Sequence, residues 1–157
     1  PLLSNNVDGS NILAGASYTN FGQVDTQGID FGLNYYFPEG LTASFAYSWF
    51  DFEIQDALPG FDTLLLPNSP ENAFSLGVAY ARDRLDAGFD LRWVDDFRWG
   101  VGPFQGDVES YATVDFNANY ALTEEVKVGV NVANLFDNEH WESFGGDLMG
   151  RRALVSL

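Results

Sequence analysis

The stretch VNVANLFDNEHW, residues 130–141, contains the pattern that decides the fold. Valines recur at every second position over residues 126–132, with Asn131 and Ala133 on the opposite side, and the alternation stops at Asn134. A period of two is typical of a β-strand with one apolar face. Soluble sheets also contain such strands, so the neighbouring segments decide which surface this apolar face contacts.

The same alternation repeats along most of the chain. It predicts strands over residues 28–37, 41–49, 74–80, 85–93, 112–120, 126–132 and 153–157, and a weaker first strand over 12–18. No segment predicts a convincing helix, and no apolar run approaches the roughly 18 residues of a membrane-spanning helix. The sequence therefore predicts an all-β protein of about eight strands.

Short and long connections alternate between these strands. The connections near residues 38–40, 82–84 and 122–124 are tight, whereas those near 55–71, 98–108 and 135–147 are long. An antiparallel up-and-down order places all the short turns at one end of the sheet and all the long loops at the other. This asymmetry is typical of an outer-membrane barrel with short periplasmic turns and long external loops. We therefore predict an antiparallel up-and-down transmembrane β-barrel.

The charges follow the same division. The chain has 23 acidic and 7 basic residues and a formal net charge of -16. Thirteen of the acids fall in the long loops: Asp51, Glu53, Asp56, Asp62, Glu71, Asp95, Asp96, Asp107, Glu109, Asp137, Glu139, Glu142 and Asp147. Arg98 is the only basic residue among them. These loops are therefore predicted to lie in water, and the acidity argues against nucleic acid as a partner.

Aromatic residues mark both ends of the predicted apolar band. They make up 16% of the chain. Tyr35, Phe37, Tyr80 and Tyr120 are beside short turns, whereas Trp49, Trp93 and Phe97 are toward long loops. Two aromatic girdles of this kind flank the apolar band of a membrane barrel. The alternative is a soluble β-sandwich in which Phe45, Phe89 and Val128 are buried against protein.

The opposite face of the strands is polar and mostly small. It comprises Asp30, Gly32, Asn34, Thr42, Ser44, Ala46, Ser48, Ala73, Ser75, Gly77, Ala79, Asp86, Gly88, Asp90, Arg92, Thr113, Asp115, Asn117, Asn119, Lys127, Gly129, Asn131 and Ala133. Small side chains fill the interior of a closed eight-stranded barrel poorly. They suit a wider lumen, so we expect the strands to be part of a larger barrel. Arg92, Lys127 and Arg152 are expected to pair with the inward aspartates.

The acidic loops offer two weak candidates for metal binding. His140, the only histidine, is beside Glu139 and Glu142, but a metal site needs several convergent ligands, and we expect a solvated side chain. Oxygen ligands for calcium are available at Asp95, Asp96, Asp107 and Glu109, at spacings that match no calcium loop. We therefore predict no metal site.

Catalytic and cofactor motifs are missing from the sequence. No nucleophile elbow or phosphate-binding glycine motif occurs, and the chain has no cysteine. Gly145 and Gly146 are interpreted as loop flexibility, and Arg151 and Arg152 as charges near the lipid headgroups. We predict no catalytic residue, no cofactor and no enzyme activity, and the sequence assigns no ligand-binding residue.

Four motifs resemble the C-terminal part of TonB-dependent outer-membrane receptors. They are Tyr18–Asp30, Leu66–Asn72, Asn131–Asp137 and Gly150–Arg152, and together they extend over nearly the whole chain. The asparagine, leucine, phenylalanine and aspartate of residues 134–137 are the most specific. Two features depart from the family pattern: the chain has no N-terminal plug or TonB box, and it ends in Leu157 where an aromatic residue is common.

The resemblance implies that residues 1–157 are the C-terminal segment of a larger barrel in the bacterial outer membrane, with Pro1 the start of a mature chain or of a fragment. The intact receptor would import a scarce nutrient, such as siderophore-bound iron, cobalamin or a glycan. Its partners would be TonB and the nutrient, both acting through the missing plug, together with outer-membrane lipid and lipopolysaccharide. The alternative function is a self-contained eight-stranded outer-membrane barrel with a structural or adhesive role. In either case Phe136 and Trp141 are expected to pack the last long loop onto the external rim.

Overall fold

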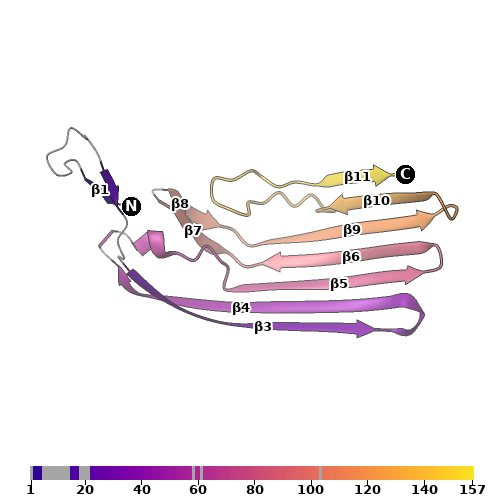
Figure 1. Ribbon diagram of the computed structural model, residues 1–157, viewed down its shortest axis with the longest axis horizontal. Helices are drawn as coiled ribbons and strands as arrows, with labels where there is room; N and C mark the ends of the chain where they lie inside the picture. The colour runs from indigo at the N-terminus through magenta and orange to yellow at the C-terminus, as the bar shows by residue number, and fades with distance from the viewer. Residues whose placement is uncertain (1, 5–14, 18–21, 58, 61, 103) are drawn as a thin grey trace.

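The computed structural model describes residues 2–4, 15–17, 22–57, 59–60, 62–102 and 104–157. Its main element is a seven-stranded antiparallel sheet in the order β11-β10-β9-β6-β5-β4-β3 (Figure 1). The strands are β3 (Gly22–Tyr36), β4 (Leu41–Ala57), β5 (Asn72–Arg82), β6 (Leu85–Val94), β9 (Tyr111–Ala121), β10 (Lys127–Ala133) and β11 (Arg152–Ser156). All seven strands predicted over residues 28–157 are confirmed.

Two small hairpins lie outside this sheet. β1 (Leu2–Ser4) pairs with β2 (Gly15–Ser17), so the predicted first strand over 12–18 does not join the main sheet; its other residues lie outside the described ranges. β7 (Phe97–Val101) pairs with β8 (Phe104–Val108). The long connection predicted near residues 98–108 therefore contains a hairpin of its own, and Phe97, Trp99 and Val101 alternate with other residues as a strand requires.

Short turns and long loops lie at opposite ends of the sheet, as predicted. The connections β3–β4, β5–β6 and β9–β10 are short and meet at the right-hand end of Figure 1, and the long loops meet at the left. The first turn contains the 3₁₀ segment η1 (Pro38–Gly40), in which Gly40 has a φ of 84°. A side chain there would collide with the Ala81 carbonyl, so only glycine fits this contact between neighbouring turns.

The remaining helical element is the four-residue 3₁₀ segment η2 (Asp62–Leu65). Within the ranges given above, no helix is long and apolar enough to cross a membrane.

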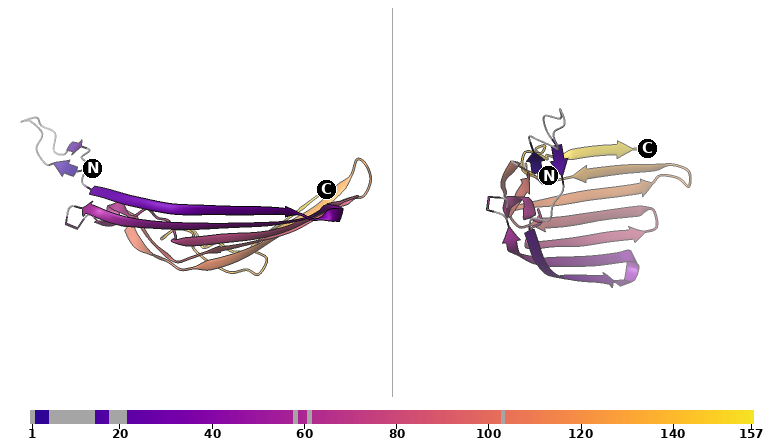
Figure 2. Two further views of the ribbon diagram at one scale, coloured as in Figure 1. Left: turned by 90° about the horizontal axis from the view of Figure 1, so that it is seen from below. Right: turned by 60° about the vertical axis from the view of Figure 1, so that its left-hand side comes forward.

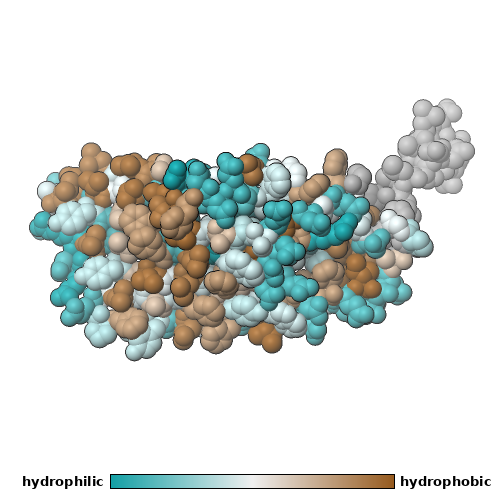
Figure 3. Space-filling view, turned by 180° about the vertical axis from the view of Figure 1, so that it is seen from behind, coloured by the Kyte–Doolittle hydropathy of each residue, from teal (hydrophilic) through white to brown (hydrophobic). Residues whose placement is uncertain are grey.

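The predicted apolar residues form one continuous face across the seven strands. Leu33 lies opposite Phe45, and Phe45 lies opposite Leu76, and the same face continues through the Val128 and Val130 positions to Val155. Many of these side chains are uncovered, for example Ile29 at 65% exposure and Phe89 at 50%. Hydrophobic residues gather toward the short-turn half in Figure 3, and hydrophilic ones toward the long loops.

The sheet is a single curved layer (Figure 2). No second sheet covers Phe89 in the described part of the chain, so the alternative of a soluble β-sandwich was wrong. The edge strands β3 and β11 differ in length, fifteen residues against five, and do not pair with each other. The described residues therefore form an open sheet, and the alternative of a self-contained eight-stranded barrel is not observed.

The best-buried side chains lie at the long-loop end. Val94, Val108 and Tyr111 are 4%, 0% and 5% exposed. The loops pack on each other here, since the Phe144 ring lies against Gly106 and Leu66 lies against Gly100. This cluster, which we call the rim core, is the only region where apolar side chains of the described residues are buried by protein.

Strands β3 and β4 extend beyond their predicted ends, and their polarity reverses there. From the short turns up to residue 49, the outer face is apolar and the inner face is polar: Trp49 is on the outer face and Ser48 on the inner face. Above it, the outer face continues with Asp51, opposite Gln27, and the inner face continues with Phe50 and Phe52, whose rings stack at 6.3 Å. The reversal places the outer boundary of the lipid-facing band at Trp49.

Candidate functional site

The inner face of the wall is the predicted polar surface. Register places Ser75 opposite Arg92, and Gly77 opposite Asp90, which in turn lies opposite Asp115. The Asp90 carboxylate and the Ser44 hydroxyl both lie over Gly77, where a Cβ atom would collide with them. Polar side chains thus lie flat along the wall over glycine, and the inner surface is smooth and hydrophilic.

A hollow of about 340 Å³ opens on this face beneath the last long loop. Residues of both charges line it. Its polar lining comprises Ser75, Asp90, Arg92, Thr113, Asp115, Asn134, His140, Glu142 and Arg152. The lining comes from strands β5, β6, β9 and β11 and from residues 134–151. Because polar groups from so many elements converge here, this hollow is the candidate site.

Asn134 fixes one side of the hollow. It is 5% exposed and has a φ of 55°, a left-handed conformation that asparagine tolerates better than most residues. Its amide group donates to the Asn138 carbonyl at 2.9 Å and accepts from the Asn138 N–H at 2.9 Å. Its own N–H donates to Asp115 at 2.8 Å. The residue ends β10 and folds the loop back over the wall, as the sequence predicted.

Asp137 and Arg151 close the base of this loop. The backbone N–H of Arg151 donates to the Asp137 carboxylate at 2.8 Å, and its guanidinium donates to the Leu135 carbonyl at 3.3 Å. Arg151 therefore holds the base of the loop, and its interpretation as a charge near the lipid headgroups stays a prediction. The last predicted motif and the start of β11 form one structural unit.

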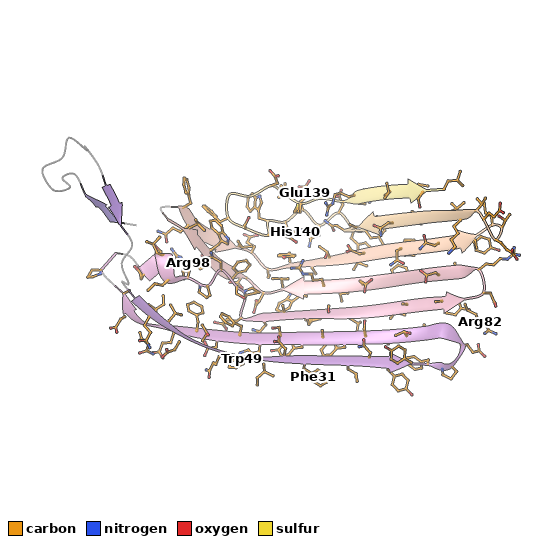
Figure 4. All side chains as sticks on the ribbon, viewed as in Figure 1. Phe31, Trp49, Arg82, Arg98, Glu139 and His140 are labelled. Atoms are coloured by element: carbon orange, nitrogen blue, oxygen red, sulfur yellow. The ribbon has the colours of Figure 1, made fainter. Side chains whose placement is uncertain are left out.

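The expectation of a solvated His140 was also wrong. Its side chain is 8% exposed, because the ring stacks on Tyr111 at a centroid distance of 4.2 Å. Nδ1 lies 2.7 Å from the Asn138 carbonyl. Nε2 lies 3.8 Å from the Glu142 carboxylate. Figure 4 shows His140 on the segment that runs beside β10 and β11.

Arg92 joins the same cluster from β6. Its guanidinium lies over the Tyr111 ring at 5.8 Å and 3.4 Å from the Glu142 carboxylate. The expected pairing of Arg92 with an inward aspartate is therefore replaced by a pair with the loop. Lys127 and Arg152 form no ion pair with any other described residue, contrary to expectation.

Tyr111 begins β9 one position beyond Trp93 and Ala112, at the external boundary of the apolar band. Burial raises the pKa of the Tyr111 phenol, the Arg92 charge opposes this effect, and the nearby Glu142 carboxylate adds to it. The phenol, the imidazole and the guanidinium therefore all approach one carboxylate.

The other sequence candidates do not form sites. Asp95 accepts hydrogen bonds from Asn72 and from the Asp96 N–H, and Asp107 lies opposite Arg98 in the β7–β8 hairpin. Among the described residues, no three His, Cys, Asp or Glu side chains gather as metal ligands would.

Phe136 and Trp141 were expected to pack the loop onto the rim, but they are 74% and 50% exposed. Tyr111, His140 and Phe144 hold it instead. No local pattern in the sequence identifies Tyr111, because its role depends on a loop about 30 residues away.

Comparisons with known proteins match this architecture. The family model described as "TonB dependent receptor-like, beta-barrel" matches residues 2–135. A metal-pseudopaline receptor of Pseudomonas aeruginosa is 34% identical over 128 residues, which cover 77% of this chain and 18% of the receptor. A vitamin B12 transporter of Vibrio vulnificus is 33% identical over 79 residues, covering 50% of this chain and 12% of the transporter. The chain thus spans less than a fifth of the length of these curated relatives.

Solved structures share the fold. The siderophore receptor of Acinetobacter baumannii superposes with a TM-score of 0.69 at 22% identity, over 85% of this chain and 21% of the receptor. The open form of a ferric-catecholate import receptor of Escherichia coli gives a TM-score of 0.67 at 21% identity, over 86% and 20%. The predicted barrel fold is confirmed, and the open sheet corresponds to part of a larger barrel.

Proposed function

Because this chain belongs to the TonB-dependent receptor-like β-barrel family of outer-membrane proteins, we propose that it forms the C-terminal wall and part of the external vestibule of a nutrient receptor. The whole protein would import a scarce nutrient of the siderophore-iron, cobalamin or glycan class. TonB would supply the driving force by pulling on the plug of the whole receptor. The chain itself would contribute binding surface and no chemistry.

One observation carries the proposal: the sheet has an apolar outer face, a small and polar inner face, and acidic long loops at one end only. Contact with lipid requires the apolar outer face, a hydrated passage uses the polar inner face, and an external vestibule uses the acidic long loops. The hollow beneath residues 134–151 faces that passage. A nutrient entering from the outside would therefore meet Arg92, Glu142 and Arg152.

The named relatives narrow the nutrient class. Proteins described as a metal-pseudopaline receptor, a vitamin B12 transporter and a ferric-pyoverdine receptor are similar to this chain, which favours a metal chelate or cobalamin over a glycan. Outer-membrane lipid and lipopolysaccharide are proposed to contact the face that includes Phe31 and Leu33.

Uptake measurements test this proposal. A strain that lacks the gene containing this chain should lose accumulation of one labelled nutrient, chosen from a panel of iron chelates and cobalamin. Complementation with the whole gene should restore accumulation, and removal of TonB should abolish it again. Unchanged uptake of every nutrient after iron or cobalt starvation, with the gene demonstrably expressed, would contradict the proposal.

A further inference from the structure

The imidazole of His140 turns a nitrogen that lacks a donor toward the hollow. A carbonyl oxygen only accepts hydrogen bonds, so Nδ1, which lies 2.7 Å from the Asn138 carbonyl, carries the ring hydrogen. In the neutral ring Nε2 is then an acceptor. The side chain is 8% exposed, and Nε2 faces the Glu142 carboxylate at 3.8 Å, which is also an acceptor. Among the described residues, therefore, no group donates to this nearly buried nitrogen.

Arg92 approaches the same Glu142 oxygen from the wall. Its Nη1 atom lies 3.4 Å from that oxygen, farther than the about 2.7–2.9 Å of a strong charge-assisted hydrogen bond. The two side chains are 57% and 44% exposed, and exposed ion pairs contribute little to stability. The Glu142 carboxylate is thus a loose occupant of the position in front of Arg92.

From this geometry we propose that Arg92 and His140 recognise a carboxylate group of the nutrient that carries a hydroxyl or amino group on the neighbouring carbon. The carboxylate would accept hydrogen bonds from the Arg92 guanidinium, and the adjacent O–H or N–H would donate to Nε2 of His140. Glu142 holds this position until the nutrient displaces it. The proposal rests on the proposed function, because it assigns this chemical group to the imported nutrient.

The two recognition groups are close together and held in place. Arg92 Nη1 and His140 Nε2 lie 3.4 Å and 3.8 Å from one Glu142 oxygen, so a single small group can contact both. The Tyr111 ring stacks on the imidazole at 4.2 Å and lies 5.8 Å from the guanidinium carbon. One aromatic ring therefore positions both groups before the nutrient arrives, which lowers the entropic cost of binding.

The other charges of the hollow limit the ligand to few anionic groups. Asp90 and Asp115 line the same hollow, and Arg152 adds one positive charge. A second carboxylate on the ligand would meet these aspartates and be repelled. A group that combines one carboxylate with a neutral hydroxyl or a positively charged amine therefore fits the lining better than a polyanionic chelate.

Two probes that differ by one hydroxyl test the proposal: 3-phenyllactate and 3-phenylpropionate. Their affinities for the detergent-purified protein that contains this chain can be measured by saturation-transfer NMR. The wild type should bind 3-phenyllactate about 10-fold more tightly, since one hydrogen bond is typically worth that factor. Arg92→Gln should weaken the binding of both probes. His140→Phe retains a ring that can stack but has no nitrogen, so it should make the two affinities equal.

Glu142→Ala gives the most specific result. It removes the internal occupant and should strengthen 3-phenyllactate binding about two- to fivefold, whereas a residue that merely supports the site would weaken binding when removed. Glu139→Ala removes an exposed carboxylate from the same segment, where Figure 4 labels it near His140, and should leave the affinity unchanged.

Three results would overturn the proposed site: no binding of either probe to the folded wild type, equal wild-type affinities, or weaker binding by Glu142→Ala. Uptake measurements fail independently of these. Nutrient uptake without discrimination between the probes would refute the site alone, and discrimination without any uptake would refute the assignment of the group to a nutrient.

Discussion

The lower wall and the rim core are built from similar residues but expose them differently. In the lower wall, between the short turns and Trp49, Leu33 and Ile29 are more than half exposed on the outer face. In the rim core, Val94 and Val108 are almost fully covered by loops and hairpins. The lower wall leaves its apolar surface to lipid, whereas the rim core must bury its own against protein because water surrounds it.

This difference explains the polarity reversal in β3 and β4. The hydrogen-bond ladder continues across Trp49, but the side that must be apolar changes from outer to inner. Phe50 and Phe52 therefore face the loops while Asp51 faces water. The boundary between the two solvents can be located to within one residue in the sequence.

The largest expected effect comes from placing a charge in the lower wall. Leu33→Arg puts a guanidinium on the outer face between Phe31 and Tyr35, where lipid cannot solvate it. We expect a loss of about 2–4 kcal/mol in the free energy of unfolding, measured by denaturant titration of the intact protein in lipid vesicles. Gln27→Arg, on the same face of the same strand but above the boundary, should cost almost nothing. Equal losses of unfolding free energy for the two variants would show that the lipid boundary does not lie at Trp49.

Asn134 tests the rim side of the comparison. Asn134→Ala removes two hydrogen bonds to Asn138 and leaves alanine in a left-handed conformation. The expected loss is about 2–3 kcal/mol, measured by the same titration. Asn131→Ala, in the extended part of β10, is the matched control and should lose less than about 0.5 kcal/mol, as surface substitutions usually do. A small effect at both positions would show that the turn is not structurally required.

Val108 and Val130 compare a protein-covered valine with a lipid-facing one. Val108→Ala should cost about 2 kcal/mol of unfolding free energy, because the lost transfer energy is joined by a cavity that the packed loops cannot fill. Val130→Ala should cost about half as much, since lipid chains refill the space. Both variants are measured by the same denaturant titration. A larger loss for Val130→Ala than for Val108→Ala would contradict the interpretation that lipid covers Val130 and protein covers Val108.

The smallest effect is expected at the short-turn end. Arg82 and Glu39 form an ion pair of 3.0 Å with side chains 48% and 76% exposed, and Figure 4 shows Arg82 at that end of the sheet. A double-mutant cycle should give a coupling of about 0.2–1 kcal/mol, decreasing as salt is added. A larger coupling that resists salt would mean that this turn is shielded from water.

The sequence alone predicted the parts of the fold that a single strand and its period can express. The seven main strands, their outer and inner faces and the grouping of long loops at one end all follow from alternation and turn residues. Alternation alone puts Leu33, Phe45 and Leu76 on one face, and the register confirms it. The motif at residues 134–137 also ended its strand where predicted.

Features that depend on two distant segments were missed. The upper halves of β3 and β4 were not predicted, because the change of phase at Trp49 resembles the end of a strand. The β7–β8 hairpin was hidden by its glycines and by Pro103. His140 was expected in water because Tyr111, the residue that stacks on its ring, belongs to the distant strand β9. Whether a loop side chain is solvated depends on how the whole rim packs, so it cannot be predicted from the composition of the loop alone.

The uninterrupted pairing of β3 with β4 has a mechanical consequence. Fifteen register pairs connect Tyr36 at the short-turn end to Gly22 at the long-loop end, with one shift between Gln23 and Val24. The part that stands in water is thus a stiff continuation of the part in lipid, without a hinge between them. Probes attached at Glu53 and Glu39 should keep a fixed distance from each other. They would therefore serve as a rigid reference for measuring movement of the neighbouring loops.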